Sequence, residues 1–129
     1  MLKLTDILKH IGKRVSAIGN VYYGTVVTNS VASKTSVIVN KLTLPAGVYV
    51  ISANIQFAIS TSAGTVVSIY QTGVGTLAIE RGDMAGGGGH SLIAIANFAN
   101  DAEVVCSVYQ AHTAAVNVTT NRLIAVRMK

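Results

Sequence analysis

The side chains best able to do chemistry in this sequence lie on either side of a glycine run, Ala85-Gly86-Gly87-Gly88-Gly89. They are Glu80, Arg81, Asp83, His90 and Ser91. A phosphate-binding glycine loop is followed by the amino terminus of a helix, but residues 90–95 are typical of a strand. Asp83, His90 and Ser91 could act as acid, base and nucleophile, yet no nucleophile-elbow turn surrounds Ser91. We therefore expect a mobile, exposed loop tip here and no catalysis.

Histidine is the second possible source of chemistry, as a metal ligand. His10, His90 and His112 are isolated along the sequence, so no pair has the spacing of a zinc-binding motif. One histidine from each of three chains around a threefold axis would supply three ligands, but solvated or hydrogen-bonded side chains are the simpler interpretation. Cys106, the only cysteine, falls on an apolar strand face and is expected to be buried. We expect no metal and no cofactor.

The distribution of charge excludes two classes of function. The chain of 129 residues has only five Asp or Glu, so a positioned carboxylate pair of the kind that cleaves glycans is not expected. The net charge of +5 comes from the two ends of the chain, and the strands between them hold almost no Lys or Arg. Nucleic-acid binding, which needs basic residues interleaved with aromatic ones, is therefore not expected either.

One stretch, residues 44–60, suggests contact with something other than water. Every second residue from Tyr49 to Ile59 is apolar, which predicts an unbroken buried strand face over residues 49–59. The interleaved residues carry no charge: Val48, Val50, Ser52, Asn54, Gln56, Ala58 and Ser60. A strand face in open water usually collects Lys and Glu, and only 12% of this chain is charged against the usual ~25%. We expect this second face to meet other copies of the chain.

The first eighteen residues follow a helical period. Their apolar residues are spaced alternately three and four apart, as in a coiled coil: Met1, Leu4, Leu8, Ile11, Val15 and Ile18. Gly12 weakens this short pattern, and one amphipathic helix docked on its own domain is the alternative. We favour a coiled coil over residues 1–19 that ends at Gly19-Asn20. Its neck residues would be Leu4, Leu8, Ile11, Val15 and Ile18.

From Val21 onward the sequence is typical of an all-β domain. Candidate strands span residues 22–28, 35–42, 47–60, 64–71, 74–80, 90–98, 102–110, 113–119 and 121–128. Short strands at this spacing, with no helical segment between them, favour a sandwich or jelly roll and disfavour an α/β fold. The length allows one domain, so we assign residues 20–129 to a β-jelly-roll head and residues 1–19 to the helical neck.

Two motifs resemble those of phage tail-fibre and receptor-binding head domains. The stretch Leu42-Thr43-Leu44-Pro45-Ala46-Gly47-Val48-Tyr49 resembles their L-x-L-P-A-G-x-Y strand opening. The ending Leu123-Ile124-Ala125-Val126-Arg127 is similar to their L-x-A-x-R terminal strand. The spacing of strands is also similar to the trimeric jelly roll of the complement C1q and tumour-necrosis-factor families, although this chain has fewer aromatic residues than C1q domains. The resemblance implies a homotrimer with both chain ends at its base and loops at its tip.

These observations together predict a trimeric, non-enzymatic phage structural protein, the host-adhesion head domain of a tail fibre or head fibre. The alternatives are a capsid decoration protein that binds the viral shell and a cellular C1q-like adhesion module. We expect the partners to be further copies of the chain together with a saccharide or protein receptor, or virion proteins. No apolar run approaches the ~18 residues of a membrane span, and no signal-peptide pattern is present. We therefore expect a soluble chain made in the host cytoplasm and carried in the virion.

The sequence suggests two groups of receptor contacts. The first is the glycine loop: Asp83, Gly86, Gly87, Gly88, Gly89 and His90. The second group combines tyrosines with nearby polar residues, as saccharide sites often do: Tyr70, Asn97, Asn100, Asp101 and Tyr109. Packing in the core or in an interface is the alternative for both tyrosines.

Overall fold

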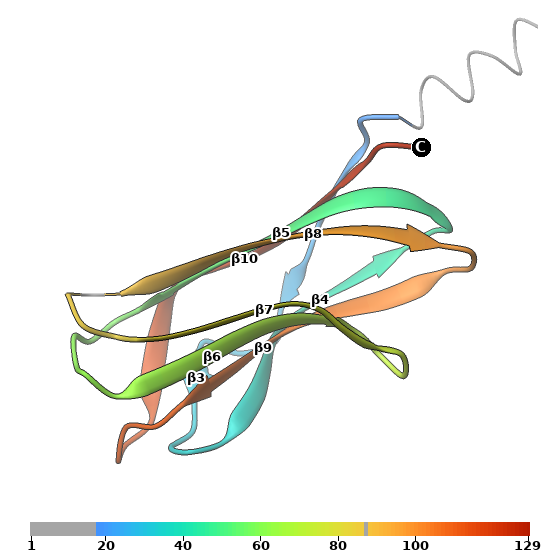
Figure 1. The fold of residues 1–129 in the computed structure, drawn as a ribbon. Coiled ribbons are helices and arrows are strands. Elements are labelled where there is room, and N and C mark those ends of the chain that lie inside the picture. The colour runs from blue at the N-terminus through green and yellow to red at the C-terminus, as the bar shows by residue number, and fades with distance from the viewer. Residues whose placement is uncertain (1–17, 87) are drawn as a thin grey trace, which may run out of the picture.

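The computed structural model describes residues 18–86 and 88–129, which form two antiparallel sheets packed face to face (Figure 1). The first sheet has the order β1-β10-β5-β8, and its strands are Val21–Tyr23, Val116–Arg127, Gly47–Phe57 and Gly89–Phe98. A short strand, β3 (Ser30–Val31), pairs with the start of β10. The second sheet has the order β2-β4-β9-β6-β7, and its strands are Thr25–Val26, Ser36–Leu44, Ala102–Gln110, Gly64–Gln71 and Gly75–Asp83. The described residues include no helix long and apolar enough to span a membrane.

The apolar alternation of the strands explains why they form a sandwich. On β5 the inward residues are buried as the sequence predicts: Tyr49, Ile51, Ala53, Ile55 and Phe57. Opposite them the second sheet buries Val67, Ile69, Val104, Cys106 and Val108. Burial of apolar surface is the main stabilising term, at roughly 25 cal/mol per Å². The predicted face is shorter than expected, because β5 ends at Phe57 and Ile59 beyond it is 38% exposed.

The chain passes from the first sheet to the second at Gly24, between β1 and β2. The Gly24 N–H donates to the carbonyl of Leu123 (2.7 Å), and a Cβ on Gly24 would collide with the side-chain oxygen of Asn40. Buried Asn40 in turn donates from Nδ2 to Oδ1 of Asn121 (3.0 Å), and Asn121 donates to the carbonyl of Val39 (3.0 Å). Glycine is therefore needed at this crossing. The hydrogen bonds of Asn40 and Asn121 connect the two sheets beside it.

Apart from shifted strand ends, such as β7, which continues to Asp83 where residues 74–80 were predicted, the observed strands differ from the predicted ones in number or continuity at three places. Residues 22–28 were expected to form one strand, but they form β1 and β2, because the chain changes sheets at Gly24. Residues 113–119 and 121–128 were expected to form two strands, but β10 is continuous, with a register shift between Val118 and Thr120. The third difference is β3, which was not predicted because two residues are too few to show an alternating pattern.

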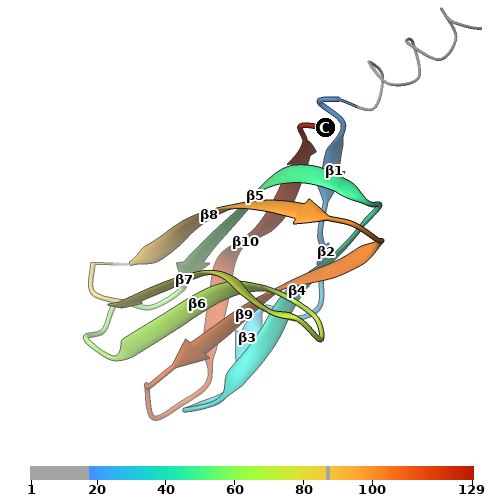
Figure 2. The same cartoon turned by 45° about the vertical axis from the view of Figure 1, so that its right-hand side comes forward.

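The described part of the chain begins beside the place where it ends (Figures 1 and 2). Gly19 N–H donates to the carbonyl of Arg127 (2.7 Å), and Val48 N–H donates to the carbonyl of Lys129 (3.0 Å). We call this pole the base, and the opposite pole, which carries the β7–β8 loop, the distal end. Most of the predicted neck lies outside the described residues. Its last member, Ile18, lies in a turn and is 55% exposed.

Candidate functional site

The outer face of the first sheet carries two rows of mostly apolar side chains near the base. The residues paired across the four strands in one row are Val21, Val126, Val50 and Ile95. Those in the next row are Tyr23, Ile124, Ser52 and Ile93. We call these eight residues the apolar face. Ile93 and Ile95 are 70% and 76% exposed, so this chain alone does not cover them.

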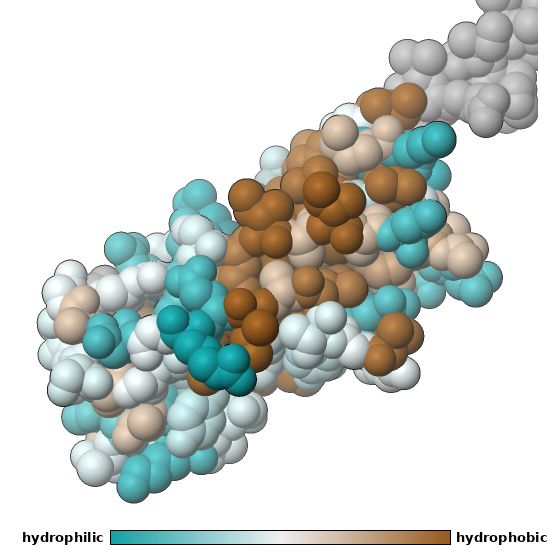
Figure 3. Space-filling view, viewed as in Figure 1, coloured by the Kyte–Doolittle hydropathy of each residue, from teal (hydrophilic) through white to brown (hydrophobic). Residues whose placement is uncertain are grey.

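The side chains surrounding the apolar face are polar but almost uncharged. The next row toward the distal end contains Arg122, Asn54 and Ser91, and Arg122 is the one charged residue at the outward positions of β1, β5, β8 and β10. Figure 3 shows hydrophobic residues gathered over the half of the molecule nearest the C-terminus, with paler and hydrophilic residues over the other half. The apolar residues thus form one patch rather than scattered exposures, and such patches mark interaction sites.

The outer face of the second sheet differs in its charge. It carries Lys41 on β4, Glu103 on β9 and Arg81 on β7, all exposed. Ile79, on β7, is the large aliphatic side chain most exposed within the strands of this sheet, at 49%. This mixture of charged, polar and single apolar residues is typical of a surface in water.

His90 joins the two sheets instead of lying in an exposed loop. It is 3% exposed, its Nδ1 lies 2.7 Å from Oε1 of Glu80, and its Nε2 lies 2.7 Å from Oγ1 of Thr65. The ring packs edge-on against Phe57, with centroids 6.2 Å apart. Gly82 makes room for it, because a Cβ there would lie 3.0 Å from His90 Cε1. The prediction that His90 is an exposed contact residue was therefore wrong, since its ring fills the space between β8 and the strands β6 and β7.

The Thr65, His90 and Glu80 side chains are connected in the order of a catalytic triad. Thr65, which would stand in the nucleophile's place, is only 2% exposed, and no substrate could reach its hydroxyl without opening the sandwich. Glu80 is the member that contacts solvent, with 43% of its side chain exposed. Within residues 18–86 and 88–129, this is also the one contact between a basic and an acidic side chain shorter than 4.0 Å, and it serves as a polar strut between the sheets.

The loop between β7 and β8 is held by hydrogen bonds. Buried Met84 accepts at its carbonyl from the N–H groups of Thr61 (3.2 Å) and Gly88 (3.3 Å). Gly86 N–H donates to the hydroxyl of Ser60 (2.8 Å). A Cβ on Gly88 would lie 2.8 Å from the carbonyl oxygen of Asp83. We expected the glycines to be free of packing, but this close approach requires glycine.

The same close packing extends to the start of β8. A Cβ on Gly89 would lie 2.9 Å from the carbonyl oxygen of Ile55, and the Phe57 N–H donates to the carbonyl of Gly88 (3.4 Å). Asp83 and Gly86 remain exposed at the distal end, while Gly87 lies outside the described residues. A receptor contact by the exposed members of the loop stays a prediction.

The second group of predicted contacts does not converge on one site. Tyr70 and Tyr109 are half-buried on the second sheet, where they pair with Val105 and Val66. Asn97 lies on the outer face of the first sheet, on β8. Asn100 and Asp101 are at the β8–β9 turn at the base, where Asp101 Oδ1 accepts from the N–H of Ala46 (3.3 Å).

Tyr23, the most exposed aromatic residue, was not among the contacts predicted from the sequence. All seven aromatic residues are described, and Tyr23, at 72% exposure, is the only one that is not at least half-buried. The sequence feature that could have predicted its exposure is the pair Tyr22-Tyr23. Adjacent strand residues point to opposite faces, so only one of the two tyrosines can face the core. Tyr22 packs inward against Tyr49, with centroids 5.8 Å apart, which leaves Tyr23 outside.

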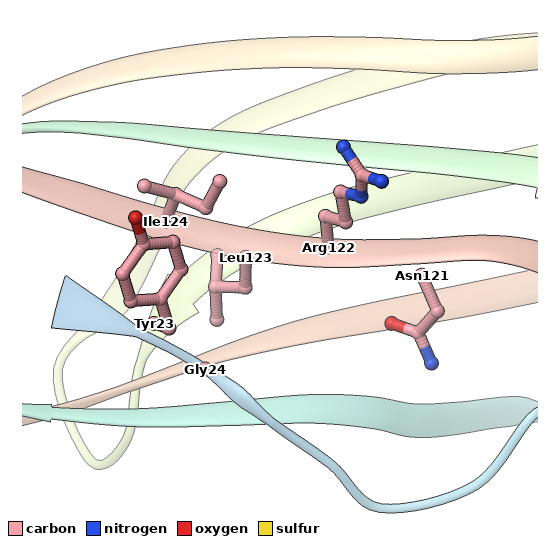
Figure 4. Close-up of a pocket in the computed structure, with 6 residues that line it drawn as sticks. All are labelled: Tyr23, Gly24, Asn121, Arg122, Leu123 and Ile124. Carbon is pink, nitrogen blue, oxygen red and sulfur yellow. The ribbon is translucent and has the colours of Figure 1, made fainter.

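Tyr23 lies between two shallow grooves. Figure 4 shows the first, of about 180 Å³, in which the ring lies beside Ile124 while Arg122 and Asn121 point to opposite sides of β10. The second is larger, about 360 Å³, and faces the second sheet. Its lining residues are Tyr22, Tyr23, Thr25, Lys41, Leu42, Thr43 and Glu103.

Within the described residues, no three His, Cys, Asp or Glu side chains gather closely enough to hold a metal ion. Cys106 is fully buried in the core, and burial raises the pKa of its thiol to about 12. The ionised, reactive form of the thiol is therefore scarce at neutral pH.

No family model matches this sequence, and neither does any curated protein. Among solved structures, the fold is similar to that of murine APRIL, determined by crystallography at pH 8.5. The TM-score is 0.60 with 14% sequence identity, and the match covers 84% of this chain and 98% of the APRIL chain. This likeness shows the fold alone, and it confirms the predicted jelly roll of the C1q and tumour-necrosis-factor type.

Proposed function

We propose that the protein is a homotrimeric phage structural protein, the head domain of a tail fibre or head fibre, which adheres to a host surface without catalysing a reaction. The apolar face is the observation that carries the oligomeric part of this proposal. The two motifs at residues 42–49 and 123–127 support the phage assignment.

The apolar face is suited to contact between copies of one chain. Ile93 and Ile95 lie on β8, at the edge of the first sheet, and their side chains are covered only when another surface packs on them. Ser52, Asn54 and Ser91 can hydrogen-bond across such an interface without the cost of desolvating a charge. A single charged residue, Arg122, borders the patch on each chain, so association would desolvate few charges.

The positions of the chain ends and of the distal loop agree with a head domain that is attached to the rest of a fibre through its base. Residues 18–20 and the carboxyl end lie together there, so a preceding neck would leave the molecule at the base. The exposed residues Asp83 and Gly86 are at the other pole, where a fibre would meet its receptor. In this arrangement the loop at the distal end lies apart from the apolar face near the base.

Light scattering tests the assembly at micromolar protein concentration. A homotrimer gives about three times the chain mass of 13.4 kDa. The double substitution Leu8→Asp with Ile11→Asp should lower this mass if the neck contributes to assembly, because it places charges in a coiled-coil seam. A monomeric wild-type protein would refute the trimer.

Binding to whole bacterial cells tests the adhesive role. A capsid decoration protein is the alternative, and it would bind assembled capsids that lack the protein rather than cells. A cellular C1q-like adhesion module is the further alternative and would bind neither. The same labelled protein, incubated with cells and with capsids and then sedimented, separates these outcomes.

A further inference from the structure

We propose that the groove beside Tyr23 on the second sheet is a binding site for a neutral saccharide. The inference deepens the proposed adhesive function and rests on it. The groove lies where β2 adds to β4, and Tyr23, just before the crossing at Gly24, forms one wall. Its volume of about 360 Å³ is at the small end of ligand sites, large enough for one or two sugar rings.

The groove is lined by a carboxylate, an ammonium group and two hydroxyl groups from the second sheet. They belong to Glu103, Lys41, Thr25 and Thr43. Lys41 pairs with Thr25 on one side and with Val105 on the other, and Thr43 pairs with Glu103. Lys41 and Glu103 are therefore diagonal neighbours on β4 and β9, and residues in this relation lie roughly 7–8 Å apart at their Cα atoms. A ligand seated between them can reach both groups.

Neither charge is neutralised by a partner in the described part of the chain. His90 with Glu80 is the one pair of a basic and an acidic side chain there that lies within 4.0 Å, so Lys41 and Glu103 do not approach each other that closely. Glu103 is nevertheless oriented, because its Oε1 accepts a hydrogen bond from the hydroxyl of Thr72 (2.8 Å). Its remaining acceptor positions are available for sugar hydroxyls, and hydrogen bonds to a charged acceptor are the stronger ones.

The balance of charge indicates a neutral ligand. The groove presents one carboxylate and one ammonium group, so its net charge is zero, and an anionic ligand held by Lys41 would be repelled by nearby Glu103. Polyhydroxylated molecules match such a site, because they donate to a carboxylate and accept from an ammonium group at the same time.

Tyr23 supplies the apolar surface that sugar recognition also needs. Its ring is 72% exposed, although the other six aromatic residues are at least half-buried in the core or on a sheet face. An exposed aromatic ring offers a rigid, amphipathic surface at small entropic cost, with a hydroxyl at its rim. The apolar face of a pyranose can lie on such a ring while its hydroxyl groups point toward Thr25, Lys41 and Glu103.

A printed array of neutral and acidic oligosaccharides, probed with the labelled full chain, tests the ligand class. We expect neutral glycans to be bound, and the best of them to saturate the protein in an NMR titration. Tyr23→Ala and Glu103→Gln should each weaken this binding by about tenfold or more, the loss typical of one charge-assisted hydrogen bond or one aromatic contact. Tyr109→Ala and Arg81→Gln, on the same sheet outside the groove, should leave it unchanged.

Three outcomes would overturn the proposal: no neutral glycan binds, only acidic glycans bind, or binding survives both groove substitutions. Because Tyr23 also belongs to the apolar face, Tyr23→Phe and the mass of each variant by light scattering serve as checks. Glu103→Gln lies away from that face, and it should weaken binding without changing the mass.

The failure of this site can be distinguished from failure of the proposed function. If the wild-type protein adheres to bacterial cells and Glu103→Gln adheres equally well, the groove is not the receptor site but the adhesive function stands. If the wild-type protein binds neutral glycans but no cells, the groove is a saccharide site and the adhesive function fails.

Discussion

The outer faces of the two sheets are built alike but differ in chemistry. Both belong to long antiparallel strands whose inner residues form one shared core. The first sheet presents the apolar face, bordered by Arg122 alone, whereas the second presents Lys41, Glu103 and Arg81. The fold alone does not require this difference, since either face could carry charged residues. In the proposed assembly, composition therefore distinguishes the face that would meet another copy of the chain from the face that would stay accessible to solvent and ligands.

The strongest test of this comparison places charges on the apolar face. Ile93→Lys combined with Ile95→Lys should convert the proposed trimer to a monomer, because burying each Ile contributes about 1.5–3 kcal/mol and a buried unpaired Lys opposes assembly. Light scattering would report the change in mass. The matched control is Ile79→Lys on the second sheet, which should leave the mass unchanged. Loss of assembly in the control, or none in the double variant, would reverse the assignment of the two faces.

The two outer faces can be compared as parts of one domain only if the two sheets unfold together. His90, which contacts both sheets, allows this to be tested. His90→Ala should lower the free energy of unfolding by about 2–4 kcal/mol, because it leaves a cavity and removes the partner of buried Thr65. Guanidinium unfolding followed by two spectroscopic probes measures both the loss and the coincidence of the transitions. His112→Ala, in the β9–β10 loop, should cost less than about 0.5 kcal/mol. If His90→Ala and His112→Ala lowered the free energy of unfolding equally, the contacts of His90 between the sheets would not stabilise the fold more than an ordinary surface side chain does.

A smaller effect is expected in the loop that connects the two sheets at the distal end. Gly88→Ala should destabilise the fold by about 1–3 kcal/mol, because the added methyl group overlaps the carbonyl oxygen of Asp83. Gly64→Ala is the control, since its Cβ would meet nothing closer than 3.9 Å. Thermal unfolding of both variants gives the difference. If Gly88→Ala is as stable as the wild type, the loop is unpacked, as the sequence first suggested.

The smallest effect concerns the core beneath both faces. The thiol of Cys106 has a pKa of about 12 when folded and an ordinary value of 9.0 when unfolded. The unfolded chain therefore loses this proton first, and the free energy of unfolding should fall by about 1 kcal/mol from pH 8 to pH 10. Denaturant titrations across this range should show a shallower decline for Cys106→Ala. If the free energy of unfolding fell equally with pH in the wild type and in Cys106→Ala, the thiol would ionise in the folded protein. Rapid chemical labelling of Cys106 in the native protein would agree with that result.

Most of the fold could be predicted from the sequence, because alternation is a local property. Residues 64–71 and 102–110 were predicted with the bounds that the structure has. The predicted break near Asn121 was wrong for a physical reason. Asn121 usually indicates a turn, but here its side chain donates to the carbonyl groups of Thr28 and Val39, which holds the residue within the strand.

The candidate sites depended on contacts between segments far apart in the sequence, which local patterns do not reveal. β8 is apolar at both inward and outward positions, so the exposure of Ile93 and Ile95 became clear only from its pairing with β5. His90 follows a glycine run and was assigned to the loop, although its partners lie 25 and 10 residues away. Tyr23 required knowledge of which tyrosine packs on Tyr49.

The position of β1 has a mechanical consequence. A pulling force applied through residue 18, directed away from the base, would reach β1 before any other strand. Because this pull runs along β1 and the hydrogen bonds of an antiparallel pair are perpendicular to the strands, the three residue pairs between β1 and β10 would be loaded together in shear. Beyond Gly24 the chain crosses to the second sheet, where the load would be shared by the whole sandwich. The described domain would therefore take such a load first on a short attachment of three residue pairs and then on the larger body behind it.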